Sequence, residues 1–164
     1  MNKTLKFRIF IFTLLICWMA TIFMFSSQHA KQSSKMSSGF VSAVITVIYP
    51  EYSELTDDAK ANITDNITLI VRKTAHFSEY FVLGVLAFLT AVTFKKYKII
   101  YRSTAAFVIC VLYSVSDEFH QYFVPGRACR FTDILIDSAG SLLAIVLMTL
   151  LFVKNSKICG KLGE

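Results

Sequence analysis

The sequence has 164 residues, is 55% hydrophobic, contains fifteen Phe and carries a formal net charge of +6. This composition is too apolar for an ordinary soluble domain, and the length allows about four membrane-spanning helices of ~20 residues each. The basic residues lie in short clusters beside apolar runs, which favours membrane topology over a nucleic-acid partner. We therefore expect one all-α, multi-pass helical membrane domain over residues 1–164.

The four cysteines are Cys17, Cys110, Cys129 and Cys159. They form no CxxC pair and have no His/Cys spacing suited to a structural zinc. On the topology given below, Cys129 has no partner on its own side of the membrane. No disulfide is expected.

The first predicted span covers approximately residues 8–25, where IFIFTLLICWMATIFMF is an uncharged and almost wholly apolar run. This run is longer than the ~7–15 apolar residues of a secretory signal, and no A-x-A-like cleavage site follows it. Lys3, Lys6 and Arg8 precede the span and place the N-terminus in the cytoplasm by the positive-inside rule.

Residues 26–73 are predicted to form an outer loop. Within it, Phe40, Val44 and Ile48 recur at helical spacing, which indicates a short amphipathic helix on the outer membrane interface. Pro50 ends that helix. The acidic stretch that follows is interpreted as a solvated connector.

The second span, approximately residues 74–94, carries His76, Glu79 and Tyr80 on one helical face. The third, approximately residues 102–123, has an apolar core too short to cross a membrane. It must therefore continue through a polar group of four residues: Asp117, Glu118, His120 and Gln121.

Pro125 and Gly126 supply a turn, and Arg127 follows it. The fourth span, approximately residues 131–153, presents Asp133 and Asp137 on one face. The same stripe continues through Gly140, Ser141 and Ala144, small residues that allow another helix to approach closely.

The distribution of Lys and Arg predicts that both termini are cytoplasmic. The ionisable residues of three separate spans then converge toward the outer face. At ~2.5–3.5 kcal/mol for each charge near the bilayer centre, such groups must pair or be hydrated, so they form a candidate site. Arg127 is the natural counter-charge because a guanidinium binds a carboxylate or phosphate through two hydrogen bonds. The candidate polar site comprises His76, Glu79, Tyr80, Asp117, Glu118, His120, Gln121, Arg127, Asp133 and Asp137.

Three segments, MFSSQ, RKTAHFSEYFVLG and SDEFHQYFVPGRACRFTDILIDSAG, together resemble the VanZ-like family, named for a teicoplanin-resistance protein. The resemblance covers most of the chain and implies a small multi-pass protein of the bacterial cytoplasmic membrane and cell envelope, linked to antibiotic resistance. The Ala-Cys-Arg segment after Arg127 departs from the small polar residues expected there. The family's polar positions fall on His76, Glu79, Tyr80, Asp117, Glu118, His120, Gln121, Pro125, Gly126, Arg127, Asp133 and Gly140.

Three hypotheses remain open. The first is a non-enzymatic protein whose outer polar site binds a lipid-linked cell-wall component or anionic headgroup and so contributes to glycopeptide (teicoplanin) tolerance. In it, Arg127 faces a phosphate or carboxylate, and four aromatic side chains hold an acyl chain or ring: Tyr80, Phe119, Tyr122 and Phe123.

The second hypothesis is an intramembrane hydrolase or transferase that acts on a lipid or cell-envelope substrate with a divalent metal. No cofactor is established, and the candidate metal ligands are His76, Glu79, Asp117, His120 and Asp133. The third hypothesis is a structural hydrogen-bonded network that only fastens the helices together. We favour the first. The sequence does not settle whether the protein is an enzyme, nor its oligomeric state.

Overall fold

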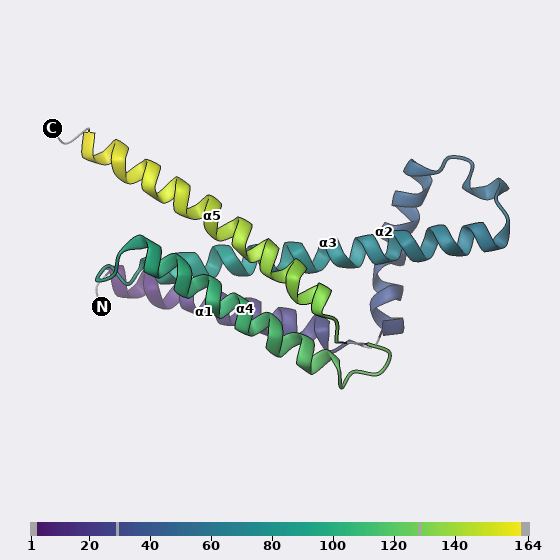
Figure 1. Cartoon of the computed structure of the whole chain (residues 1–164), viewed down its shortest axis with the longest axis horizontal. Coiled ribbons are helices and arrows are strands. Elements are labelled where there is room, and N and C mark those ends of the chain that lie inside the picture. The colour runs from purple at the N-terminus through teal and green to yellow at the C-terminus, as the bar shows by residue number, and fades with distance from the viewer. Residues whose placement is uncertain (1–2, 29, 128, 162–164) are drawn as a thin grey trace.

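The computed structural model describes residues 3–28, 30–127 and 129–161, and these residues are almost entirely helical (Figure 1). The described part contains no strand, which confirms the all-α prediction. Four of the helices are long and apolar enough to cross a membrane: α1, α3, α4 and α5. The elements in chain order are α1 (Lys3–Ser26), α2 (Ala30–Ile48), the short 3-10 helix η1 (Tyr52–Glu54), α3 (Asp57–Val92), α4 (Ile99–Gln121) and α5 (Phe131–Lys161).

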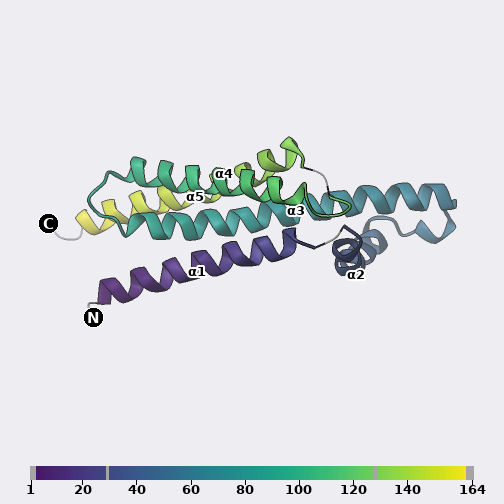
Figure 2. The same ribbon diagram turned by 90° about the horizontal axis from the view of Figure 1, so that it is seen from below.

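Helix α3 is the central element of the bundle. It contacts α1, α4 and α5, and its contact with α5 is the most extensive in the molecule. Figure 2 shows α1 lying along one side of the other three long helices. The apolar core lies where these four helices meet and consists of Leu15, Ile22, Tyr80, Leu83, Ala87, Phe88, Ala106, Cys110 and Ile145.

Helix α3 begins at Asp57. The acidic stretch at residues 51–66 was interpreted as a connector, and for residues 57–66 that interpretation was wrong. Thr56 starts the helix by accepting a hydrogen bond from the Ala59 N–H, and Asp57 and Asp58 in the first turn complement the helix dipole. At ~1.5 Å per residue α3 is about 54 Å long, well beyond the ~30 Å hydrocarbon thickness of a bilayer. Its N-terminal part projects past the bundle (Figure 1).

Helix α2 packs against this projecting part of α3 rather than standing alone. Val41 and Ile45 are buried against Ile67 of α3. The predicted short helix therefore exists. Phe40 and Ile48 of its predicted stripe are exposed, Val44 is partly buried, and Val41 and Ile45 contact α3. Helix α2 is held by its contact with apolar residues of α3, and the sequence pattern alone did not predict this contact.

Helices α3 and α5 meet through small residues, as the stripe on the fourth span predicted. A Cβ added at Gly140 would lie 2.3 Å from the backbone oxygen of Phe77. A Cβ added at Gly84 would lie 2.7 Å from the backbone oxygen of Ser141. Both glycines are therefore close-contact positions between the two helix backbones.

The connection between α4 and α5 contains the predicted turn. The Arg127 N–H donates to the Val124 carbonyl at 3.0 Å, which closes a four-residue turn. Pro125 occupies its second position, and Gly126 has a φ of 78°. A type II turn requires a positive φ at its third position, which explains the glycine.

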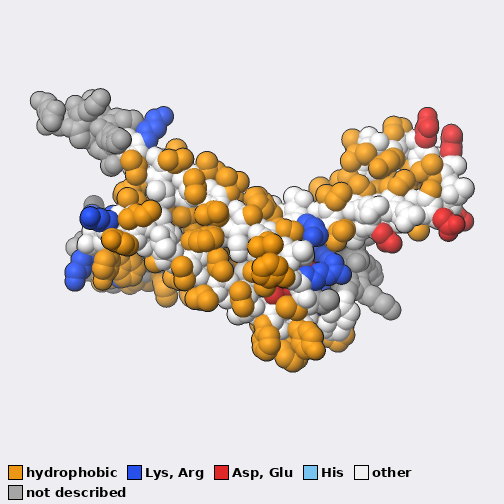
Figure 3. Space-filling view, in the orientation of Figure 1, with side chains coloured by type: hydrophobic (Ala, Val, Ile, Leu, Met, Phe, Trp, Pro, Cys, Tyr) orange, Lys and Arg blue, Asp and Glu red, His pale blue; other side chains and the backbone are white. Residues whose placement is uncertain are grey.

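The surface of the four-helix region is predominantly apolar (Figure 3). Figure 3 shows basic side chains at the end where α1 begins and α5 ends, and acidic side chains at the tip of the projecting α3 segment. Cys17, Cys110 and Cys129 are free thiols. The side chain of Cys159 lies outside the described residues.

Candidate functional site

Three carboxylates in the bundle interior share one unusual feature. Asp117 and Glu118 of α4 and Asp137 of α5 are almost completely buried, and each has one oxygen that accepts a hydrogen bond. The other oxygen of each side chain is buried without a hydrogen-bond partner in the described part of the chain. A buried polar atom without a partner is expensive, so this repeated pattern calls for a physical explanation.

Asp117 is held between α1 and its own helix. Its Oδ2 accepts from the Ser26 hydroxyl at 2.7 Å and from the Gln121 amide at 3.2 Å. Gln121 also reaches Ser26 at 3.3 Å, which completes a small polar triangle. The pairing of Asp117 with Gln121 agrees with their predicted common face, and Ser26 places the end of α1 at this site.

Asp137 lies at the centre of the contact between α3, α4 and α5. Its Oδ2 accepts from the Ser114 hydroxyl at 2.9 Å. Its Oδ1 lies 3.5 Å from Nδ1 of His76, a distance that permits an ion pair but makes no good hydrogen bond. The hydroxyl of Tyr80, one turn from His76, is also buried without a hydrogen-bond partner.

Glu118 and Asp133 lie near the loop that joins α4 to α5. The backbone N–H of Arg130 donates to Glu118 at 2.9 Å, so Arg130 contributes here through its main chain. Lys73 of α3 forms an ion pair with Asp133 at 3.7 Å. These contacts tie the loop and the start of α5 to α4 and α3.

Arg127 lies within electrostatic reach of Asp117 and Glu118, but in the described part of the chain it does not make the direct carboxylate contact that was predicted for it. Its Nε donates to the backbone carbonyl of Gln28 at 3.2 Å, and it makes no carboxylate ion pair within the described residues. Burial and the nearby guanidinium of Arg72 lower the pKa of Arg127, although the charges of Asp117 and Glu118 oppose this shift. Two cationic groups therefore lie close together at the edge of the polar site.

His120 and Glu79 are the less buried members of the candidate set. The His120 ring lies against Phe23, and its Nε2 is 3.1 Å from the Ser27 hydroxyl. It therefore contacts α1 rather than the Asp137 group. Glu79 is half-buried within electrostatic reach of His76, and its backbone carbonyl accepts a hydrogen bond from Trp18 at 2.9 Å.

The four predicted aromatic residues do not form one surface. Tyr80 is fully buried in the core, whereas Phe119, Tyr122 and Phe123 are each about two-thirds exposed. Phe123 packs edge-on against both Phe119 and Tyr122, so these three rings form an exposed cluster at the end of α4. An acyl chain held jointly by all four rings is inconsistent with this geometry.

The predicted metal ligands are not arranged around a common point. Within the described part of the chain, no group of three His, Cys, Asp or Glu residues is placed to hold a metal ion. Asp133 pairs with Lys73, and His120 contacts Ser27. The described residues therefore give the metal hypothesis no support.

Two buried hydroxyls at this site were missed from the sequence. Ser114 precedes Asp117 by three residues and Gln121 by seven, so the helical period could have identified it on the same face. Ser26 ends α1, and nothing in its local sequence indicates that it bonds a residue of α4. Its role depends on which helix lies beside α1.

A sequence model of the family described as VanZ/LLP1 matches residues 10–152, which is most of the chain. Neither the search of curated proteins nor the search of solved structures gave a significant match.

Proposed function

The chain belongs to the VanZ/LLP1 family, and from this we propose that its buried polar site binds the polar part of a lipid-linked or cell-wall component. The protein presents four apolar helices of membrane-spanning length. A ligand that reaches the polar site of this protein must therefore enter from the membrane surface or from within the bilayer. An amphiphile meets this requirement because its chain stays in the lipid while its head group enters the protein.

The observation that carries this proposal is the set of half-satisfied carboxylates. One oxygen each of Asp117, Glu118 and Asp137 accepts no hydrogen bond within the described residues, although that of Asp137 lies 3.5 Å from Nδ1 of His76. Hydroxyl and amino groups, which are abundant on sugars and cell-wall peptides, could donate hydrogen bonds to these carboxylate oxygens. A hydrogen-bond network that only joins helices gains no stability from three carboxylate oxygens that accept no hydrogen bond, since each such buried acceptor costs about 1–3 kcal/mol.

The proximity of Arg72 and Arg127 supports a phosphate or carboxylate on the same ligand. Both side chains are half-buried, and each charge disfavours the other. A bound anion would relieve this repulsion, and the guanidinium geometry suits a bidentate contact. The proposed ligand thus combines donor groups for the carboxylates with an anionic group for the arginines.

We place the protein in a bacterial cytoplasmic membrane with both termini in the cytoplasm, following the positive-inside rule. The polar site then faces the outer side, where lipid-linked cell-wall components meet glycopeptide antibiotics. When the polar site binds such a component, the access of glycopeptides to it changes, which contributes to teicoplanin tolerance. The metal-dependent hydrolase gains no support, because its candidate ligands are not grouped around a common point in the described residues.

The test is teicoplanin susceptibility of a sensitive Gram-positive host that expresses the wild type, Asp117→Asn or Glu118→Gln at matched membrane levels. Each amide keeps the size of the side chain but replaces one acceptor oxygen by a donor. The matched control is Asp65→Asn, an exposed carboxylate on the projecting part of α3. We expect protection by the wild type and the control, and its loss in both site variants.

Two results would contradict the proposal. Absence of protection by the wild type would remove the link to glycopeptide tolerance. Protection by both amide variants at the wild-type level would show that the carboxylates serve only to join the helices.

A further inference from the structure

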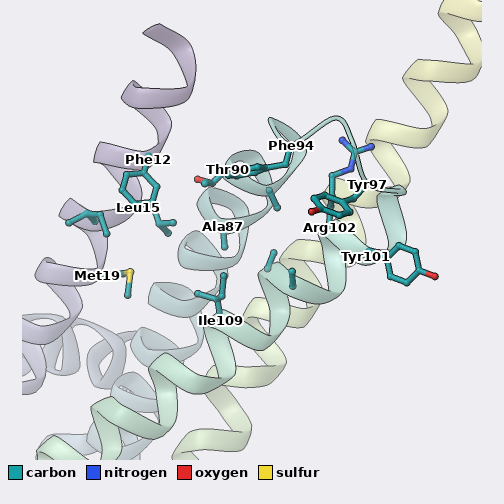
Figure 4. Close-up of a pocket in the computed structure, with 14 residues that line it drawn as sticks. Phe12, Leu15, Met19, Ala87, Thr90, Phe94, Tyr97, Tyr101, Arg102 and Ile109 are labelled. Carbon is teal, nitrogen blue, oxygen red and sulfur yellow. The ribbon is translucent and has the colours of Figure 1, made fainter. Parts of the chain in front are cut away.

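A second feature lies at the opposite end of the bundle, far along the helices from the polar site. A groove of about 600 Å³ runs between α1, α3 and α4. Its walls include Phe12 and Met19 of α1, Ala87 of α3, Phe94 of the loop that follows α3, and Arg102 and Ile109 of α4 (Figure 4). The volume is within the ~300–1,000 Å³ typical of small-molecule sites.

The groove has a polar end and an apolar end. Helix α3 runs from Ala87 to its end at Val92 toward the basic loop at residues 93–98, whereas α4 runs from Arg102 to Ile109 away from that loop. Phe94 therefore lies in the loop and Arg102 lies near it, whereas Ala87 lies ~7.5 Å before the end of α3 and Ile109 lies about 10 Å deeper than Arg102 along α4. This depth is about two-thirds of one ~15 Å leaflet.

Two arginines mark the polar end. Arg102 lines the groove and donates from Nη1 to the Val92 carbonyl at 3.1 Å, but its buried Nε has no hydrogen-bond partner in the described residues. The Arg8 guanidinium lies 3.9 Å above the ring of Phe94, which itself lines the groove. Lys95, Lys96 and Lys98 occupy the adjoining loop. The electrostatic potential here favours an anion.

The groove is also open to the membrane. Phe12, Ile16 and Ile109 line it, and about half of each side chain is exposed on the apolar surface of the bundle. A molecule can therefore enter sideways from the lipid without passing through water. An occupant with an anionic group at the surface and an apolar chain toward the bilayer centre matches the direction of the groove.

We propose that this groove binds one acyl chain of an anionic glycerophospholipid, whose phosphate contacts Arg102 and Arg8. The positive-inside rule places the site in the cytoplasmic leaflet. It is separate from the proposed outer polar site and does not depend on the function assigned there. A lipid of the general annulus would lack the two arginines and the enclosing walls, so selectivity for the head group distinguishes the two.

The experiment is native mass spectrometry of the purified full-length protein in mild detergent, with phosphatidylglycerol or phosphatidylcholine of identical acyl chains added. We expect one phosphatidylglycerol to bind at least about tenfold more tightly than phosphatidylcholine, which corresponds to about 1.4 kcal/mol. Arg8→Gln and Arg102→Gln should each reduce that preference severalfold. Ala105→Trp, which fills the groove from an exposed position, should abolish binding.

Matched controls address charge and bulk separately. Lys154→Gln removes an exposed cation of α5 that does not line the groove, and Ala139→Trp adds the same bulk as Ala105→Trp at an exposed position on α5. Both should bind phosphatidylglycerol as the wild type does. Equal affinity for the two lipids, or undiminished binding by Ala105→Trp, would overturn the proposal. Arg8→Gln keeps the test valid if Arg102→Gln fails to fold.

Discussion

The close contact of α3 and α5 predicts a large effect for Gly140→Ala. The new methyl group would lie 2.3 Å from the Phe77 oxygen and 3.2 Å from the Phe77 carbonyl carbon. Ordinary van der Waals contact begins near 3.4 Å, so the two backbones must separate by about 1 Å. Overpacking typically costs ~1–3 kcal/mol, and we expect the upper end because backbone atoms cannot rotate away.

Gly39→Ala provides the matched control. No atom lies within 4 Å of a Cβ at this helical position, so the substitution brings the same gain in helix propensity, about 1 kcal/mol, without a clash. The difference between the two variants therefore isolates the cost of the contact. We expect Gly140→Ala to be less stable than Gly39→Ala by about 3 kcal/mol.

The assay is reversible unfolding of the purified protein by sodium dodecyl sulfate in mixed micelles. The only tryptophan, Trp18, packs against the core and hydrogen-bonds α3, so its fluorescence reports the folded bundle. Equal free energies of unfolding for Gly140→Ala and Gly39→Ala would refute the close α3–α5 approach. The helix interface on which the polar site depends would then be wrong.

Three further substitutions test separate contacts. Trp18→Phe removes an N–H donor to a backbone carbonyl of α3 and should lower the free energy of unfolding, measured by circular dichroism, by about 0.5–1.5 kcal/mol. Ser114→Ala removes the one hydrogen bond that Asp137 accepts within the described residues and should cost about 1–3 kcal/mol, whereas Ser116→Ala, at an exposed position on α4, should change the same measurement little. Ile45→Ala empties the contact between α2 and α3 and should speed amide hydrogen exchange in residues 38–48 while leaving α4 unchanged; equal exchange rates would show that α2 is not held by this face.

Much of the candidate site was accessible from helical spacing. Asp117 and Gln121 were placed on one face and do share a hydrogen bond, and Gly140 was expected where a helix approaches closely. These predictions succeeded because the 3.6-residue period of a helix is fixed by its backbone hydrogen bonds. Positions three, four or seven residues apart must therefore lie together in any packing.

The sequence was a poorer guide to which acceptor each basic side chain contacts. The sequence suggested Arg127 as the cation for the carboxylates, but its Nε donates to the Gln28 carbonyl, and Lys73 pairs with Asp133 instead. A long flexible side chain reaches several acceptors, and its position depends on loop geometry. The spacing of residues along the sequence does not determine that loop geometry.

The amino-acid sequence by itself determined that this chain forms apolar helices, where polar residues interrupt them, and which residues share each helical face. It did so because apolar length and helical period are local properties. Only the tertiary structure decided that α3 continues far beyond the bundle, that Ser26 meets Asp117, and that Asp117, Glu118 and Asp137 each keep one buried oxygen that accepts no hydrogen bond within the described residues. Those features depend on the rotation and neighbours of whole helices, which are set by packing between segments far apart in the chain.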